Sequence, residues 1–305
     1  MPNIGSNYRG RFAPSPTGPL HLGSLIAALA SYLDARHHRG QWLLRMEDLD
    51  PPREEPGAAN SILQSLRDHG LHWDGDVLYQ SQRSQAYDQA LQRLADTGAL
   101  FRCDCTRAML GPGGSCNGRC QGRQRELSQP WALRLPVAEG THIEFEDQLQ
   151  GLQQEALYAE LPDYVLHRKD GLYAYQLAVV VDDAFQAISH VVRGSDLLDS
   201  TARQIYLQKQ LGLPQPIYCH LPVITNDQGQ KFSKQNHAPA LQASEASANL
   251  RAALAFLQQP APPPELDHCH GAQSIQQSEH GNTDEGTVLD GVQPLQQLSI
   301  DGHSM

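Results

Sequence analysis

The 305-residue chain has 40% hydrophobic residues, six cysteines and a formal net charge of −11. This length is enough for about two domains with a substantial core. No apolar run reaches the roughly 18 residues that a membrane span requires, and the first residues lack a secretory signal, so we expect a soluble, cytoplasmic protein with no membrane partner. In that compartment the cysteines are expected to be thiols or metal ligands, not disulfides.

The acidic residues are unevenly distributed along the chain. Between Pro260 and Met305 there are seven Asp or Glu residues and no Lys or Arg, so the body of the chain is only mildly acidic. Six arginines gather in one short region of that body: Arg102, Arg107, Arg119, Arg123, Arg125 and Arg134. These residues predict a local basic face, so the net charge does not exclude a nucleic-acid partner.

The stretch from Arg11 to Ser24 predicts a phosphate-binding turn. A short strand over Tyr8–Ala13 ends in a loop rich in Pro and Gly, and apolar residues then recur at helical spacing over Leu22–Leu33. The N-terminus of this helix would face the loop, with His21 beside it and Gly23 allowing a ligand to approach the backbone. A strand–turn–helix with an incidental histidine is the alternative interpretation.

The residues from Gln41 predict an apolar strand that ends in Glu47 and Asp48, before two prolines. In an open α/β sheet, ligands bind beyond the carboxyl ends of the strands, so Glu47 is a candidate for holding a substrate ammonium. A capping or solvated acidic loop is the alternative. Helical spacing over Ala58–Gly70 and Ala86–Gly98 completes an alternation of strands and helices, which predicts a parallel sheet.

Two close cysteine pairs, Cys103 with Cys105 and Cys116 with Cys120, flank a glycine-rich segment. Four thiolates satisfy tetrahedral zinc, and two pairs on one looped segment reach a single ion with little loss of chain entropy. No further Cys or His lies beside them in the sequence, so we predict a closed, structural zinc site. Free thiols are the alternative.

Residues Trp131–Asp170 have the pattern of strands and turns, with a hairpin turn expected at Lys169–Gly171. Beyond the turn, alternation over Leu172–Leu177 predicts a strand with both of its tyrosines on one face, where their default role is packing. The apolar run Val179–Ala184 is expected to return to the main sheet as a buried strand.

A further buried strand, from Ile188, ends at Arg193. An arginine in this position is well placed to bind a carboxylate through two parallel hydrogen bonds, and an Arg–Asp pair that holds the loop is the alternative. A capped helix is expected over Ser200–Leu211, followed by a strand from Ile217 in which Cys219 belongs to the core.

Lys231 and Lys234 follow a turn and are candidates for binding triphosphate, with a solvated lysine pair as the alternative. A closing helix is expected over Ala240–Gln259. Residues 260–305 are too polar to fold alone, and we expect a disordered acidic tail. We assign no role to Cys269 and the histidines beside it.

Together these motifs resemble the HIGH and KMSKS signatures of class I aminoacyl-tRNA synthetases. The stretch Arg11–Ser24 is similar to the first signature and Lys231–Gln235 to the second, with Ser24 in place of the second His and Phe232 in place of Met. The sequences RFAPSPTG, RMEDLDPPR and VVRGSDLL are similar to the glutamyl branch. The resemblance extends from about residue 8 to residue 257, and it implies a Rossmann-like α/β fold.

A full glutamyl-tRNA synthetase continues into an anticodon-binding domain, whereas one expected helix and a polar tail follow the second signature here. We therefore expect no such domain. With the cysteine pairs, this layout resembles the glutamyl-Q tRNA(Asp) synthetase family. The resemblance implies activation of L-glutamate with ATP and magnesium, and transfer of glutamate to the queuosine base of tRNA(Asp), whose anticodon stem-loop takes the place of an acceptor end.

The resemblance also implies roles for individual residues. Arg11 and Arg193 would bind the glutamate carboxylates and Glu47 the ammonium, in a pocket completed by Phe12, Ala13, Pro14, Ser15 and Tyr175. ATP would be bound by His21, Gly23, Ser24, Lys231 and Lys234, of which His21 and Lys234 would stabilise the charge that develops on the α-phosphate. Zinc would be bound by Cys103, Cys105, Cys116 and Cys120. The third of these ligands can be Tyr in the family, and here Cys116 occupies that position.

We therefore expect a monomer with four parts. Residues 1–100 form the first half of the catalytic domain, 101–170 a zinc-containing insert with an RNA-binding subdomain, 171–259 the second half, and 260–305 the tail. Three alternatives stay open: a short glutamyl-tRNA synthetase that charges a tRNA 3′ end, an adenylyltransferase for a small molecule, and an inactive paralogue used for binding or regulation. The intact set of site residues disfavours the last.

Overall fold

The computed structural model describes residues 8–122, 130–224 and 239–260. Its helices are α1 (Leu22–His37), α2 (Ala58–Asp68), α3 (Ser84–Asp96), α4 (Leu157–Glu160), α5 (Tyr175–Phe185), α6 (Leu198–Leu211) and α7 (Ala246–Phe256). Its strands are β1 (Arg9–Phe12), β2 (Gln41–Met46), β3 (Leu78–Tyr79), β4 (Phe101–Cys103), β5 (Ala132–Pro136), β6 (Ile143–Asp147), β7 (Gly151–Glu155), β8 (Asp163–His167), β9 (His190–Gly194) and β10 (Ile217–Leu221). In these three segments we find no helix with the length and apolar character needed to cross a membrane.

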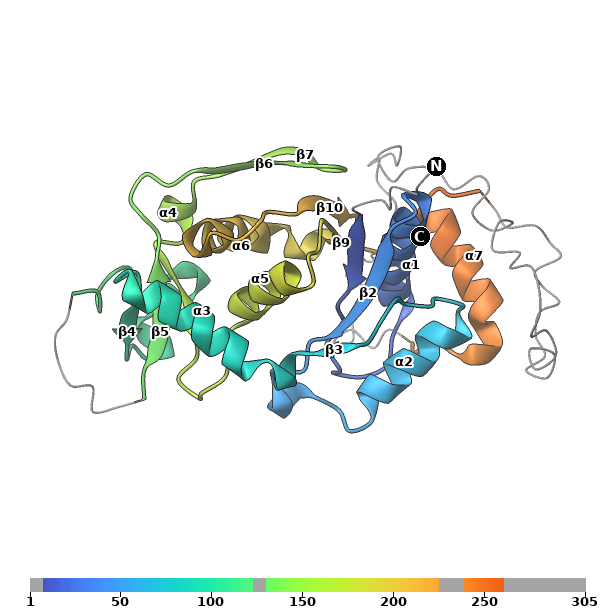
Figure 1. Ribbon diagram of the computed structural model, residues 1–305, viewed down its shortest axis with the longest axis horizontal. Helices are drawn as coiled ribbons and strands as arrows, with labels where there is room; N and C mark the ends of the chain where they lie inside the picture. Colours follow the sequence, from blue (N-terminus) through green and yellow to red (C-terminus); the bar gives the residue numbers. More distant parts are fainter. Residues whose placement is uncertain (1–7, 123–129, 225–238, 261–305) are drawn as a thin grey trace, which may run out of the picture.

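The first half of the main sheet consists of β1, β2 and β3, which run parallel in that order. Helix α1 packs on β1 and β2 and buries Leu25, Leu29 and Leu33, the apolar positions that the sequence spacing predicts. Helix α7 lies beside α1 on its outer side (Figure 1). One apolar core, which includes Trp42 and Phe256, joins these elements.

The second half has the order β7-β6-β10-β9, with β9, β10 and β6 parallel and β7 antiparallel to β6. Strand β9 meets β1, where the Ser189 N–H donates to the Arg9 carbonyl at 3.0 Å. The two halves therefore lie edge to edge, and the predicted α/β fold with a parallel sheet is confirmed. This arrangement brings the carboxyl ends of β1, β2, β9 and β10 to one edge, where an open α/β sheet binds its ligands.

The cysteine-bearing insert lies at the far end of the molecule from α7 (Figure 1). Its strands β4, β5 and β8 form a separate antiparallel sheet. A second apolar core, built by α3, α5 and α6 with β6 and β8, connects this sheet to the main sheet. The strand and turn pattern predicted for Trp131–Asp170 is therefore confirmed.

The strands predicted over 172–177 and 179–184 are wrong, because most of these residues form helix α5. Residues 177–180 are all buried, since α5 packs against α3, α6 and β8. A helix covered on several sides shows no amphipathic spacing, and a short apolar run rich in valine then resembles a buried strand. The predicted turn at Lys169–Gly171 is present, and a single bridge pairs His167 with Tyr173.

Two helix boundaries also differ from the prediction. Helix α6 begins at Leu198 rather than Ser200 and has no side-chain cap at its start, whereas Gly212 ends it with a φ of 63°. Helix α7 begins only at Ala246. A 3-10 turn over Ala243–Glu245 precedes it, and before that turn the Leu241 N–H donates to the Leu20 carbonyl at 2.9 Å, beside the start of α1. The predicted lysine loop and acidic tail lie outside the described residues.

Candidate active site

Two cavities adjoin at the carboxyl ends of the parallel strands. The larger, of about 340 Å³, lies among the ends of β1, β2 and β9 and the start of α5. The smaller, of about 220 Å³, lies between the start of α1 and the segment that follows β10. Ala27 and Gly194 line both cavities, so a molecule in one cavity lies directly beside a molecule in the other.

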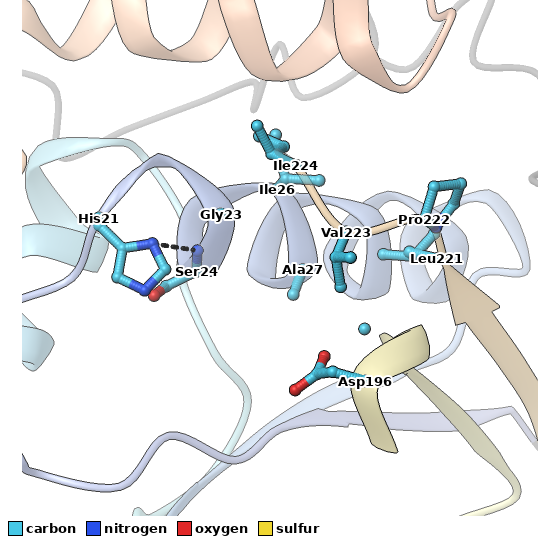
Figure 2. A pocket seen from close by; sticks show the side chains of 11 residues that line it. His21, Gly23, Ser24, Ile26, Ala27, Asp196, Leu221, Pro222, Val223 and Ile224 are labelled. Atoms are coloured by element: carbon cyan, nitrogen blue, oxygen red, sulfur yellow. Dashed lines mark hydrogen bonds between the residues drawn. The ribbon is translucent and has the colours of Figure 1, made fainter. Parts of the chain in front are cut away.

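His21 stands at the smaller cavity and caps helix α1 with its side chain. Its Nδ1 accepts a hydrogen bond from the Ser24 backbone N–H at 3.3 Å (Figure 2). Nδ1 therefore provides a lone pair, and the neutral ring carries its proton on Nε2. In this form the ring can donate a hydrogen bond from Nε2 to a phosphate oxygen.

The remaining walls of the smaller cavity come from both halves of the sheet. Gly23 and Ser24 line it at the start of α1, where backbone N–H groups and the helix dipole favour an anion. Figure 2 shows Asp196 and Val223 on the opposite side, from the segments that follow β9 and β10. Lys231 and Lys234, predicted for the same site, lie outside the described residues.

The larger cavity brings together four polar side chains that the sequence singled out: Arg11, Glu47, Tyr175 and Arg193. Phe12, Ala13 and Ser15 also line it. Pro14, predicted for the same pocket, does not line the cavity, but its carbonyl accepts the Glu47 N–H at 2.9 Å. This bond fastens the loop after β1 to the end of β2 and fixes where Glu47 leaves the sheet.

Buried charges alternate in sign below this cavity. Asp183 of α5 has one carboxylate oxygen 3.2 Å from Arg11 Nε and 2.7 Å from Arg45 Nη1. Arg45 in turn has Nη2 3.6 Å from Glu47 Oε1, and its side chain is fully buried. Each buried charge thus has a neighbour of opposite sign, without which its burial would be strongly unfavourable.

The two carboxyl groups of this network differ in their pKa. Burial opposes ionisation of Asp183, but the positive charges of Arg11 and Arg45 hold its pKa below the ordinary 3.8. For Glu47, burial prevails over the same two arginines and raises the pKa above 4.5. Glu47 is therefore the carboxyl group whose charged form gains most from a further cation, such as a ligand ammonium.

Arg193, in β9, is buried and held by neutral groups. Its Nε donates to His220 Nε2 at 3.0 Å, Nη1 to Gln204 Oε1 at 2.9 Å and Nη2 to Thr201 Oγ1 at 2.8 Å. Two longer contacts of 3.4 Å reach the Tyr175 hydroxyl and a backbone carbonyl. These long contacts are the ones that a ligand carboxylate would replace, because charged hydrogen bonds are shorter and stronger.

The two cavities together suit a defined kind of chemistry. Two guanidinium groups and one carboxylate complement a small zwitterion that carries more than one carboxylate. A helix N-terminus with a neutral histidine complements a phosphate group. Since the cavities share a wall, a bound carboxylate can meet a bound nucleotide there without a protein nucleophile.

Four buried cysteines form a second polar centre in the insert. The sulfur atoms of Cys103, Cys105, Cys116 and Cys120 lie within 4.8 Å of one another, and those of Cys105 and Cys120 are 3.5 Å apart. Bonds of about 2.3 Å in tetrahedral zinc place thiolate sulfurs about 3.8 Å apart, so the four residues fit one ion. Burial raises the pKa of the Cys103 and Cys116 thiols to about 11, and a bound cation would displace their protons.

Asp163, at the start of β8, anchors the second cysteine pair. Its carboxylate accepts the Ser115 hydroxyl at 2.8 Å and the Cys116 N–H at 3.0 Å, and it pairs with Arg134 Nε at 2.5 Å. These bonds explain why Ser115 and Cys116 are both fully buried. The cysteine loop is thereby held against the β4-β5-β8 sheet.

The predicted basic face is only partly present. Arg134 is buried by its pairing with Asp163 and does not belong to it, since a buried, paired guanidinium does not reach solvent. Three members are exposed: Arg102, Arg107 and Arg119. The Arg102 guanidinium stacks 4.5 Å from the ring of Trp131. Arg123 and Arg125 lie outside the described residues.

Sequence reasoning missed Arg45, Asp183 and His220, which hold the residues that line the larger cavity. A signal existed for the first two, because each is a charged residue inside an apolar run: Leu43–Met46 and Val179–Ala184. Burial of a charge requires a partner, so such positions are candidates for ion pairs. Their partners come from distant parts of the chain, and no local pattern identifies them.

Comparisons with known proteins identify the family of this chain. The model of the catalytic domain of class I tRNA synthetases (E and Q) matches residues 7–112 and 117–257. Fold and site thus define a class I tRNA synthetase catalytic domain. Proteins named glutamyl-Q tRNA(Asp) synthetase from Thiobacillus denitrificans and Dechloromonas aromatica are 55% and 52% identical to this chain, matching 84% and 85% of it and 87% and 89% of their own lengths. The chain belongs to the glutamyl-Q tRNA(Asp) synthetase family.

Solved structures give the same fold. A glutamate tRNA ligase from Elizabethkingia meningosepticum, in complex with its amino acid, superposes with a TM-score of 0.68 at 28% identity. A glutamate-tRNA synthetase from Elizabethkingia anophelis gives 0.67 at 29%. Each match covers 75% of this chain and 52% or 53% of the other protein, so the chain spans about half the length of these two synthetases.

We predict that Asp183→Asn lowers the free energy of unfolding by about 3 kcal/mol at pH 7, because it leaves two buried guanidinium groups without their anion. The folded pKa of Asp183 is depressed, so its stabilising effect is present above 3.8 and is lost as the pH falls through the lower folded value. The difference between the two proteins should therefore shrink below pH 3.8. Urea denaturation at pH 7 and at pH 3 measures it.

The exposed Asp76 provides the control, and Asp76→Asn should change the free energy of unfolding by less than about 0.5 kcal/mol. An unchanged stability of Asp183→Asn at pH 7, or a difference that grows on acidification, would contradict the network.

Proposed function

We propose that the protein activates L-glutamate with ATP to form glutamyl-adenylate and transfers the glutamyl group to the queuosine base of tRNA(Asp). The observation that carries this proposal is the larger cavity, in which Arg11, Arg193 and Glu47 meet beside a phosphate-suited cavity. The names of the relatives support the same substrate and acceptor.

The charges of L-glutamate, two carboxylates and one ammonium, are complementary to those of Arg11, Arg193 and Glu47 in the larger cavity. In our proposal Arg11 and Arg193 each bind one carboxylate, and Glu47 binds the ammonium. What supports this placement is the pair of long 3.4 Å contacts on Arg193, which a carboxylate can replace. L-Glutamine fits less well, because its amide NH₂ would face guanidinium N–H groups with no acceptor between them. Phe12, Ala13, Ser15 and Tyr175 complete the pocket.

The substrate carboxylate is itself the nucleophile in the activation step. Its oxygen attacks the α-phosphorus of ATP, a C–O–P linkage forms, and the bond to pyrophosphate breaks. His21, with its proton on Nε2, would donate to the charge that develops on the α-phosphate, together with Lys234. Gly23, Ser24 and Lys231 would hold the nucleotide, and magnesium bound to ATP would neutralise charge on the leaving pyrophosphate.

In the transfer step, a nucleophilic group of the queuosine base attacks the activated carbonyl and AMP leaves. We propose that the anticodon stem-loop lies against the insert, residues 101–170, between the catalytic halves 1–100 and 171–259. The exposed Arg102, Arg107 and Arg119 support this placement, because exposed cations bind RNA phosphates. The ring of Trp131 beside Arg102 adds an aromatic surface of the kind on which bases stack.

We also propose that the four cysteines bind one zinc ion with a structural role. Zinc would cross-link Cys103 and Cys105, at the end of β4, to the loop that carries Cys116 and Cys120. The fit of the four sulfur atoms to one tetrahedral ion supports it. Such a cross-link stiffens the surface on which the stem-loop is proposed to lie.

We predict that the protein purified without chelators contains about one equivalent of zinc by elemental analysis. Cys116→Ser should lose most of it, because one of four thiolate ligands is removed. Cys219→Ser, at a buried cysteine outside the cluster, should keep the metal content of the unmodified protein. Purified protein without zinc, or equal zinc in both variants, would refute the assignment.

The acceptor is tested by transfer of labelled L-glutamate to tRNA from cells that make queuosine and from cells that do not. We predict label only on the queuosine-containing tRNA, and label that survives periodate oxidation of the 3′ end. Label on both preparations that is lost after oxidation would instead identify a glutamyl-tRNA synthetase. Absence of label from both would favour a small-molecule substrate or a regulatory role.

A further inference from the structure

Arg193 donates a hydrogen bond to His220 in β10, and His220 is in turn hydrogen-bonded to Asp147 at the end of β6. His220 and Asp147 are both fully buried in the second half of the sheet. Neither residue lines either cavity. The Asp147 carboxylate lies 2.5 Å from His220 Nδ1, and His220 Nε2 lies 3.0 Å from Arg193 Nε. The three side chains thus form one continuous row that ends at the larger cavity.

The hydrogen bonds of Asp147 fix the position of the His220 proton. Its Oδ1 accepts backbone N–H groups of Leu149, Gln150 and His220 at 2.9 to 3.1 Å, which leaves Oδ2 for the imidazole. Burial opposes ionisation of Asp147, but the hydrogen bond from His220 and these N–H groups lower its pKa below 3.8. A carboxylate only accepts hydrogen bonds, so His220 carries its proton on Nδ1 and a lone pair on Nε2.

The imidazole is also neutral at pH 7. Burial lowers the pKa of His220 below 6.5, the hydrogen bond to Asp147 opposes this shift, and the positive charge of Arg193 adds to it. The groups that face the ring from neighbouring elements are Asp147, Arg193, the Thr201 hydroxyl at 3.1 Å and the stacked ring of Tyr218. A neutral ring of this tautomer presents an acceptor to Arg193.

We propose that His220, oriented by Asp147, is the positioning residue that sets the rotation of the Arg193 guanidinium for the glutamate carboxylate. With Nε held by His220, Nη1 contacts Tyr175 and Gln204, and Nη2 contacts Thr201 and the Leu197 carbonyl. Since Tyr175 and Leu197 both line the larger cavity, each Nη atom has a contact at that cavity. This inference rests on the proposed function, because the ligand of Arg193 is taken to be a glutamate carboxylate.

The chemistry of the partner matters as much as its position. Arg11 is paired with a carboxylate, Asp183, whereas the described hydrogen-bond partners of Arg193 are all neutral. A neutral acceptor orients a guanidinium without cancelling its charge. Arg193 therefore keeps its full positive charge for the substrate, with Asp147 one side chain further away.

Two substitutions at His220 separate positioning from packing. An Asn side chain ends near the position of Nδ1, so His220→Asn keeps a donor for Asp147 and loses the acceptor for Arg193. A Gln side chain reaches the position of Nε2, so His220→Gln keeps an acceptor for Arg193 and loses the bond to Asp147.

We predict that His220→Asn raises the KM for glutamate in ATP–pyrophosphate exchange about tenfold or more, with a KM for ATP and a kcat close to those of the unmodified protein. His220→Gln should stay within about threefold.

Asp147→Asn tests the same row without changing His220. The three backbone N–H groups bind the amide oxygen, so the amide NH₂ faces Nδ1 and the imidazole proton must move to Nε2, against the Arg193 N–H. We predict a raised KM for glutamate and a change of His220 from the Nδ1–H to the Nε2–H tautomer in ¹⁵N NMR spectra. Thermal unfolding without substrate provides the measure of folding for each variant.

Equal KM values for His220→Asn and His220→Gln, or an unchanged KM for both His220→Asn and Asp147→Asn, would overturn the positioning role while leaving the proposed function intact. A loss of kcat with unchanged KM in the Asn variants would also overturn it. Failure of the unmodified protein to use glutamate in the exchange would instead overturn the proposed function, and this inference with it.

Discussion

A buried carboxylate, Asp183, joins the parts from which the larger cavity is built. Asp183 lies in α5 and accepts a hydrogen bond from Arg11 of β1 and another from Arg45 of β2. Charges of this kind are stable inside a protein only in contact with opposite charges. The two strands and the helix must therefore close on one another for any of the three side chains to be buried, and the site is assembled before a substrate arrives.

The wall between the two cavities shows how the fold permits an attack of one substrate on another. Gly194 lines both cavities at the end of β9. A β-carbon at this position would collide with the Asp196 carboxylate and lie 3.6 Å from a Val223 methyl group. Glycine therefore leaves little side-chain bulk between the two cavities, as the proposed attack of a carboxylate oxygen on an α-phosphorus would require.

Local parts of the fold and of the site could be predicted from the sequence, because short-range rules govern them. The loop and helix from Arg11 to Leu33 could be predicted from the prolines, the glycines and the spacing of apolar residues. Glu47 could be placed at the end of a strand because the residues before it are mostly apolar. The four cysteines that lie together were identified by number and spacing. The roles of the cavity residues came from family resemblance, and they remain predictions here.

The rest depended on packing between distant segments. Helix α5 was expected as a strand because its apolar residues contact neighbours on several sides. In the sequence, His220 is an ordinary polar residue in an apolar strand. Its contacts with Asp147 and Arg193 arise only because β10 lies between β6 and β9. The same holds for Arg134, expected on the surface, which is buried because Asp163 comes from β8.

In the proposed function, the preassembled pocket selects L-glutamate by its two guanidinium groups and one carboxylate. The most direct measurement is ATP–pyrophosphate exchange by the unmodified protein with L-glutamate and with L-glutamine at equal concentrations. We predict that the kcat/KM for L-glutamate exceeds that for L-glutamine by about two orders of magnitude or more, since the amide leaves buried donors unpaired. Equal use of the two amino acids, or exchange with neither, would contradict it.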